Sequence, residues 1–176
     1  MPKHVGFLRA VNLGRRRVPM AKLVDVVAEL GHGDVWTFVN SGNVVFDATG
    51  SRAKLEQGIE AGLEQALGFE VTTFVRTAAE LRRALALEPF DLAAGDTYFV
   101  TFLKDRLPAA KAKALEALGN DFDTLVVRGR DVHWHMRGPS TETTLTTKQW
   151  AGVAGHHRST SRNMNMLRRL AAKMEA

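Results

Sequence analysis

The hydrophobic pattern of the first half switches between a period of two, typical of strands, and a period of about 3.6, typical of helices. Residues 5–11 alternate between the two sides of a strand, with Val5 and Phe7 on its more apolar side. Pro19 then begins a segment in which apolar residues recur at helical spacing until Gly31. The pattern therefore predicts a strand followed by an amphipathic helix.

A hairpin and a second helix are expected next. Val35–Val39 and Val44–Asp47 are rich in β-branched and aromatic residues, and the turn formers of residues 40–43 lie between them. Ser51 is a suitable N-cap for a helix with apolar residues at helical spacing, and Gly68 is a suitable end for it.

A fourth strand, Glu70–Arg76, gives residues 4–76 the order βαββαβ. This is the ferredoxin-like order, in which a four-stranded antiparallel sheet carries both helices on one face. The second half predicts a similar but shorter series. Its expected elements are a capped helix from Thr77 to Pro89, a strand at 97–103, a helix at 108–118, strands at 125–128 and 132–137, an irregular stretch at 138–147 and a helix at 163–173.

The predicted fold class is therefore α+β, with two tandem ferredoxin-like (βαββαβ-type) antiparallel-sheet domains. Domain one is predicted to span residues 1–76, a helix and linker to span 77–96, and domain two with its C-terminal helix to span 97–176. A chain of 176 residues has room for two domains of this size.

The composition excludes several classes of protein. There is no cysteine, which excludes disulfides, thiolate nucleophiles and cysteine-based zinc sites and fits a cytoplasmic protein. The first residues carry no apolar signal segment, and no apolar run approaches the roughly 18 residues that cross a bilayer. No membrane partner is expected, and the oligomeric state is open.

The net charge is +5, with the excess concentrated at the Arg15–Arg17 loop and in the last 39 residues. A basic balance favours anionic partners such as phosphate, nucleotide or nucleic acid. The same excess of basic residues is also explained if the charge only keeps the protein soluble. Both interpretations, anionic partners and solubility, stay open here.

Three segments resemble a bacterial family known as domain of unknown function 1697. Residues 8–14, followed by Val18-Pro19-Met20, are similar to the opening of that family. Residues 37–46 are similar to its hairpin, and residues 160–165 to its C-terminal signature. The resemblance implies two ferredoxin-like repeats. It implies no activity and supplies no catalytic residues.

The chain departs from the family pattern at three positions. Ala10 stands where the family usually has Gly, Met164 where it often has Trp, and Met166 where it often has Thr. If that Trp packs or stacks on a ligand, the C-terminal motif is altered in this chain.

Strand direction brings two polar loops together. In a βαββαβ unit, the loop after the first strand and the turn after the second lie at the same end of the sheet, beside the N-terminus of the first helix. Guanidinium groups, amides and a helix N-terminus suit a phosphate or carboxylate. The predicted anion-binding residues are Asn12, Arg15, Arg16, Arg17, Ser41 and Asn43, with Arg162, Asn163 and Asn165 as a second polar cluster.

Structural explanations compete with this site. The Arg loop suits a solvated surface, and the Asn and Gly residues suit turn geometry. Ser161 or Asn163 suits an N-cap of the last helix. Arg9, on the apolar side of the first strand, is expected to need a partner such as Asp47 if that side is buried.

No catalytic, metal or cofactor site is predicted. His133 and His135 alternate on one strand, but no carboxylate accompanies them at convincing spacing, and an exposed polar strand face explains them better. Nucleic-acid binding through stacked aromatics would use Phe7 and Phe46, although no RNA-binding signature is present.

The sequence thus favours a non-enzymatic binding module with an anion-preferring surface for phosphate or nucleic acid. The alternative is an enzyme acting on a small phosphorylated or carboxylated metabolite between the two domains. Nucleic acid and an anionic small molecule are the candidate partners.

Overall fold

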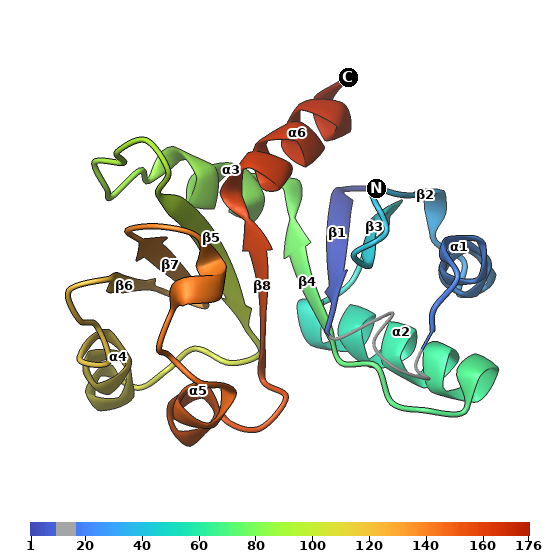
Figure 1. Cartoon of the computed structure of the whole chain (residues 1–176). Helices are drawn as coiled ribbons and strands as arrows, with labels where there is room; N and C mark the ends of the chain where they lie inside the picture. The colour runs from blue at the N-terminus through green and yellow to red at the C-terminus, as the bar shows by residue number, and fades with distance from the viewer. Residues whose placement is uncertain (10–16) are drawn as a thin grey trace. The chain divides into compact units, whose positions relative to one another are not determined.

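The computed structural model describes residues 1–9 and 17–176 (Figure 1). Within these residues the chain forms two four-stranded antiparallel sheets and six α-helices, which confirms the α+β class. The chain divides into two compact units. The first unit comprises Met1–Arg82 with Leu170–Ala176, and the second unit comprises Arg83–Arg169.

The elements follow the chain in two similar series. The first series is β1 (Lys3–Leu8), α1 (Met20–Glu29), β2 (Gly33–Thr37), β3 (Asn43–Asp47), α2 (Arg52–Leu67), β4 (Thr73–Thr77) and α3 (Ala78–Ala86). The second is β5 (Thr97–Leu103), α4 (Ala109–Glu116), β6 (Asp123–Arg128), β7 (Asp131–Met136), a 3-10 turn (Ser140–Glu142), α5 (Thr147–Ala154), β8 (Ser159–Asn163) and α6 (Met164–Glu175). The strand orders are β2-β3-β1-β4 and β6-β7-β5-β8.

Local signals produce most helix boundaries as expected. The Ser51 side chain accepts the Lys54 N–H, and Gly68 ends α2 with a φ of 81°, in the left-handed region that glycine tolerates. Thr77 and Glu80 form the predicted reciprocal cap of α3, with the Thr77 N–H donating to the Glu80 carboxylate (2.8 Å) and the Glu80 N–H to the Thr77 hydroxyl (3.1 Å).

Helix α5 and strand β8 were missing from the predicted second series. A detectable signal for α5 exists, because Thr146 and Gln149 form a full capping box before Trp150. Strand β8, with the sequence Ser-Thr-Ser-Arg-Asn, carries no apolar alternation. It forms by antiparallel pairing with β5, so its signal lies in the tertiary structure.

The core of the first unit lies between one face of its sheet and the helices α1 and α2. Apolar residues of the sheet, of α1 and of α2 pack together there in one cluster. Its fully buried members include Leu8, Leu23, Val27, Val44, Phe46, Ile59, Leu63 and Val75. The side chains of Val5 and Phe7, also fully buried, belong to the opposite side of β1, because successive residues of a strand alternate in direction.

In the second unit, one sheet face packs against α4 and α5. The buried cluster joins β7 residues to Leu115 of α4 and Trp150 of α5. The rings of Trp134 and Trp150 lie 5.2 Å apart between centroids, within the range of favourable aromatic pairs. This packing places the two histidines of β7, which alternate with Val132, Trp134 and Met136, on the other face.

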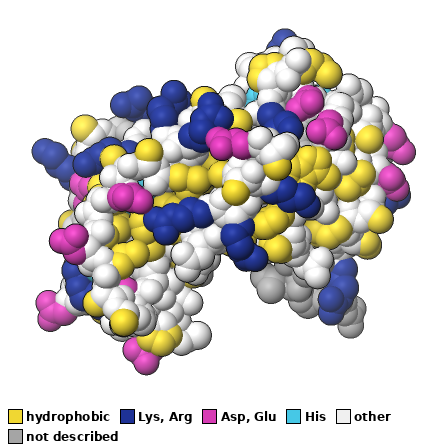
Figure 2. Space-filling view, turned by 90° about the horizontal axis from the view of Figure 1, so that it is seen from above, with side chains coloured by type: hydrophobic (Ala, Val, Ile, Leu, Met, Phe, Trp, Pro, Cys, Tyr) yellow, Lys and Arg dark blue, Asp and Glu magenta, His cyan; other side chains and the backbone are white. Residues whose placement is uncertain are grey.

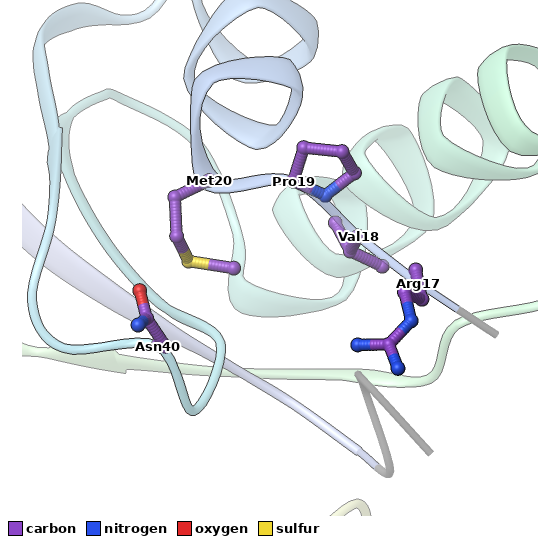
Figure 3. Close-up of a pocket in the computed structure, with 5 residues that line it drawn as sticks. All are labelled: Arg17, Val18, Pro19, Met20 and Asn40. Carbon is purple, nitrogen blue, oxygen red and sulfur yellow. The ribbon is translucent and has the colours of Figure 1, made fainter. Parts of the chain in front are cut away.

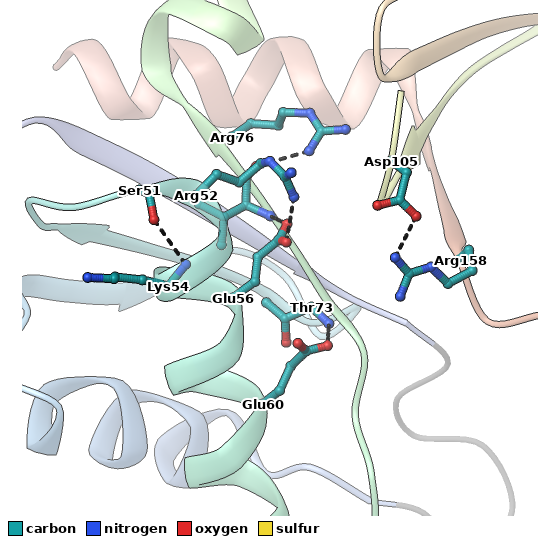
Figure 4. A network of polar contacts seen from close by, with 10 residues as sticks. Ser51, Arg52, Lys54, Glu56, Glu60, Thr73, Arg76, Asp105 and Arg158 are labelled. Carbon is teal, nitrogen blue, oxygen red and sulfur yellow. Dashed lines mark hydrogen bonds and ion pairs between the residues drawn. The ribbon is translucent and has the colours of Figure 1, made fainter. Parts of the chain in front are cut away.

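Helix carboxylates bind the N–H groups of two edge strands, β4 (Figure 4) and β6. The Val75 N–H of β4 donates to Glu56 at 2.9 Å, and the Thr73 N–H donates to Glu60 at 3.1 Å. The spacings match, because four helical residues advance about 6 Å and two strand residues about 6.6 Å. In the second unit the Val127 N–H of β6 donates to Glu116 at 3.0 Å. These contacts satisfy groups that an edge strand would otherwise offer to another chain.

The strand register changes one expectation about Arg9. Asp47 lies opposite Lys3 at the start of β1, whereas Arg9 follows the end of β1. The predicted pairing of Arg9 with Asp47 is therefore wrong. Burial lowers the pKa of the Arg9 guanidinium, and its backbone N–H donates to the Thr72 carbonyl at 2.9 Å.

Candidate anion-binding site

A pocket of about 380 Å³ lies where α1 begins (Figure 3). It is lined by Arg17, Val18, Pro19, Met20 and Asn40, all within the first unit. In the close-up, the side chains of Met20 and Val18 lie between those of Asn40 and Arg17. The pocket therefore joins the start of α1 to the turn between β2 and β3, two segments that strand direction placed at one end of the sheet.

Helix α1 starts without a side-chain cap. Its N-cap, Pro19, has an extended ψ of 136° and makes no side-chain cap hydrogen bond, and the first turn contains no acidic residue. The first backbone N–H groups of a helix carry partial positive charge and favour an anion nearby. The start of α1 thus has the polarity that the sequence predicted for this end of the sheet.

Arg17 adds a full positive charge to the pocket. Its side chain is exposed, and in the described part of the chain no carboxylate forms an ion pair with it. A guanidinium can bind a carboxylate or phosphate through two parallel hydrogen bonds. Among the predicted site residues that the structure describes, Arg17 is the one that lines this pocket.

Asn43 and Ser41 hold the turn beside the pocket. The Asn43 side chain is fully buried and its Nδ2 donates to the Phe38 carbonyl (2.9 Å) and to the Ser41 hydroxyl (2.7 Å). The Phe38 N–H in turn donates to the Asn43 carbonyl at 3.0 Å. These bonds give both side chains a role in shaping the turn, as the competing structural explanation expected.

Val39 occupies a strained conformation in the same turn. Its φ of 52° lies in the left-handed region, which a β-branched residue rarely adopts. Asn40, the next residue, lines the pocket. Asn40 was not among the predicted anion-binding residues, although its turn was expected at this end of the sheet. Its position in the Asn-Ser-Gly-Asn turn was the available signal.

The remaining predicted site residues fall into two groups. Asn12, Arg15 and Arg16 lie outside the described residues. Arg162, Asn163 and Asn165 lie in the second unit, and their participation in an anion site stays a prediction.

Arg162 is buried within the second unit's sheet. Its Nη1 donates to the Thr160 hydroxyl at 2.9 Å and to the Ser161 carbonyl at 3.0 Å. Burial lowers its pKa to about 10. The Asn163 side chain accepts the Asn165 N–H at 2.8 Å, a local bond at the start of α6 that agrees with the predicted capping.

The histidines of β7 are buried, so their predicted exposure is wrong. His133 is 1% exposed and its Nδ1 is hydrogen-bonded to the Tyr98 hydroxyl. His135 Nε2 lies 2.8 Å from the Asp96 carboxylate, and the Phe90 ring packs against both Tyr98 and His135. The spacing of the two histidines in the sequence predicted that they share a face of the strand. Their contact partners lie on β5 and in the segment before it. Within residues 1–9 and 17–176, no group of three His, Asp or Glu residues is placed to hold a metal ion.

His133 should make stability depend on pH. Burial, with a smaller contribution from the charge of Arg128, lowers its pKa from 6.5 to about 4. The unfolded chain therefore binds this proton more readily than the folded chain, and stability should fall between pH 6.5 and 4, by at most about 3 kcal/mol. Urea unfolding at pH 7.5 and 4.5 measures the loss.

His133→Gln should reduce that loss, whereas His156→Gln, in an exposed loop, should leave it unchanged. Part of the pH dependence should remain in His133→Gln, because burial and the charge of His4 also lower the pKa of His32. An unchanged pH dependence in His133→Gln would contradict the assignment.

Phe7 and Phe46 are both fully buried, and the register places them on opposite faces of the sheet. Neither ring is accessible to a nucleobase. In the space-filling view (Figure 2), Lys and Arg side chains are interspersed with acidic and hydrophobic ones. Charge alone therefore does not select a binding surface on this face. In the described residues no helix is long and apolar enough to cross a membrane.

Comparison with solved structures supports the fold. The chain is similar to the conserved bacterial protein SP0830 from Streptococcus pneumoniae, with a TM-score of 0.78 and 21% sequence identity over 100% of this chain and 99% of that one. At this identity the similarity concerns the fold alone. No curated protein matches the chain.

Comparison with protein families confirms the resemblance seen in the sequence. The family described as "Protein of unknown function (DUF1697)" matches residues 1–133. This match includes the opening segment and the hairpin segment of the resemblance, and it covers well over half of the 176 residues. The chain therefore belongs to the DUF1697 family.

Proposed function

We propose that this protein is a non-enzymatic binding module that holds an anion in the pocket at the start of α1. One observation carries the proposal: Arg17 lines a pocket at an uncapped helix N-terminus, and no acidic residue lies in the first helical turn. The charge of a guanidinium and the partial charge of the helix terminus have the same sign, and both favour an anion.

The lining also favours binding over catalysis. Its five residues include one cation and one amide, with Val18, Pro19 and Met20 as apolar neighbours. This described lining offers no carboxylate, histidine or hydroxyl that could act as a general base or nucleophile. A site of this composition can orient an anion through charge and hydrogen bonds.

The proposal includes the architecture that presents the pocket. Both sheets have the same strand order, with the first strand of each series at a central position. This order supports two tandem ferredoxin-like repeats, with predicted domains at 1–76 and 97–176 joined by 77–96. A cytoplasmic location likewise stays a prediction, based on the cysteine-free sequence.

Replacing Arg17 tests the proposal. Isothermal titration with inorganic phosphate at low salt should show binding to the wild-type protein and a loss of about tenfold or more in affinity for Arg17→Gln, because a charge-assisted hydrogen bond contributes about 1.5–3 kcal/mol. Arg106→Gln removes the same charge from an exposed residue of the second unit and should bind as wild type.

Equal losses in the two variants would show a general charge effect and would refute the pocket. A salt titration with single-stranded RNA and DNA separates the nucleic-acid version. Steep loss of affinity with rising salt indicates contacts with several phosphates, and no binding at low salt excludes that version.

A further inference from the structure

We infer that the pocket takes a small organic oxyanion, a carboxylate or phosphate monoester attached to an apolar group, in preference to a nucleic-acid backbone. This inference rests on the proposed function, since it uses the same pocket and the same Arg17. It adds to the proposed function the apolar group that the ligand carries beside its oxyanion.

The apolar lining supplies the first argument. Val18 is 1% exposed and belongs to the buried core cluster, and Met20 is partly buried against that cluster. Pro19 is exposed, so Pro19 and Met20 supply the accessible apolar surface of the pocket, and Val18 supports it from the core. A ligand carbon group placed there would leave water for a surface that the core already holds in position, which is favourable in proportion to the apolar area covered.

The arrangement of the polar groups supplies the second argument. Arg17 and Asn40 lie at the two ends of the labelled lining, with the side chains of Met20 and Val18 between them (Figure 3). A ligand whose oxyanion contacts Arg17 would therefore place its remaining atoms over Met20 and toward the amide of Asn40. A bare inorganic anion would leave that apolar surface uncovered.

Size and the absence of stacking rings from the described lining supply the third argument. A volume of about 380 Å³ is that of a small-molecule site, for which about 300–1,000 Å³ is usual. Single-stranded nucleic acid is normally held by a path of several cations with aromatic rings that stack on the bases. The described lining has no aromatic ring, and Phe7 and Phe46 are buried.

The experiment compares three probes by isothermal titration: inorganic phosphate, phenyl phosphate and an oligothymidylate of about ten nucleotides. In the wild-type protein, phenyl phosphate should bind about tenfold more tightly than inorganic phosphate, because its ring covers the apolar lining. The oligothymidylate should bind no more tightly than inorganic phosphate.

The variant Met20→Gln tests the apolar contact separately. It keeps a long side chain and a good helix former at the first position of α1, but replaces the thioether by a polar amide. It should lower the affinity for phenyl phosphate more than the affinity for inorganic phosphate and so lose most of the preference, and an unchanged midpoint of urea unfolding shows that the variant is folded. Arg17→Gln should weaken binding of both small probes.

The outcomes separate the two proposals. Arg17-dependent binding with equal affinity for phosphate and phenyl phosphate would overturn the inference and leave the anion site intact. Tighter binding of the oligothymidylate, with a steep salt dependence, would overturn it in favour of nucleic acid. A preference for phenyl phosphate that survives in Met20→Gln would show that the ring binds elsewhere and would also overturn it. Failure of all three probes would refute both proposals.

Discussion

Replacing Asp123 with alanine is expected to destabilise the protein by about 4 kcal/mol, because the carboxylate is fully buried and joins several elements of the second unit. Its Oδ1 accepts the Trp134 indole N–H at 2.8 Å and the Thr143 hydroxyl at 2.7 Å. Its Oδ2 accepts from Asn120 Nδ2 at 3.2 Å. Alanine would leave these donors without their acceptor and would leave space beside the ring of Trp134.

Urea unfolding followed by tryptophan fluorescence measures this loss. Asp123→Asn should cost about half as much, since its amide keeps one acceptor oxygen but brings an NH₂ group toward a donor. Asp121→Ala is the matched control, because Asp121 is exposed two residues earlier and should cost less than about 0.5 kcal/mol. Similar losses in Asp121→Ala and Asp123→Ala would contradict a specific role for the buried carboxylate.

Glu56→Ala should destabilise the protein by about 3 kcal/mol for a related reason. The Glu56 carboxylate is buried on α2, where it accepts the Val75 N–H at 2.9 Å and forms a 2.6 Å ion pair with Arg52 (Figure 4). Alanine would leave a buried backbone donor on the edge strand β4 and remove the partner of a partly buried guanidinium.

Two neighbouring carboxylates of α2 provide a graded comparison. Glu60→Ala removes one bond to the Thr73 N–H from a partly buried site and should cost about 1 kcal/mol. Glu64→Ala lies one further turn along the helix, is exposed and should cost almost nothing. Chemical denaturation of the three variants should give the order Glu56, Glu60, Glu64. Equal costs would show that helix charge, and not capping of the edge strand, determines the effect.

Substitutions of Asp123 and Glu56 should change a different measured property from a substitution in the pocket. Asp123 and Glu56 bind groups of the protein itself, so their loss should appear in stability. Arg17 is exposed, with no described carboxylate paired to it, so its loss should appear in ligand affinity with little change in stability. Measuring both quantities on all three variants therefore separates the structural carboxylates from the candidate binding residue.

The candidate site was predicted in part. Strand direction alone placed the start of the first helix and the hairpin turn at one end of the sheet, and the structure brings Arg17 and Asn40 to one pocket there. The roles of Ser41 and Asn43 could not be predicted, because an asparagine in a turn can bind a ligand or its own backbone. Only the three-dimensional position of the Phe38 carbonyl shows that Asn43 binds within the turn.

The sequence by itself determined the features that depend on neighbouring residues. Ser51 caps the start of α2 and Gly68 ends it, and Thr77 with Glu80 caps the start of α3. These signals are local, because capping involves residues a few positions apart. The family could also be recognised from short segments, as the match to residues 1–133 confirms.

Tertiary structure decided the features that depend on residues far apart in the chain. Strand β8 has no apolar alternation and forms on the edge of β5, which lies more than 50 residues earlier. His133 is buried, and its Nδ1 is hydrogen-bonded to the hydroxyl of Tyr98, 35 residues earlier. Local patterns record which face of a strand a residue occupies, but the burial of that face and the partners it meets depend on long-range packing.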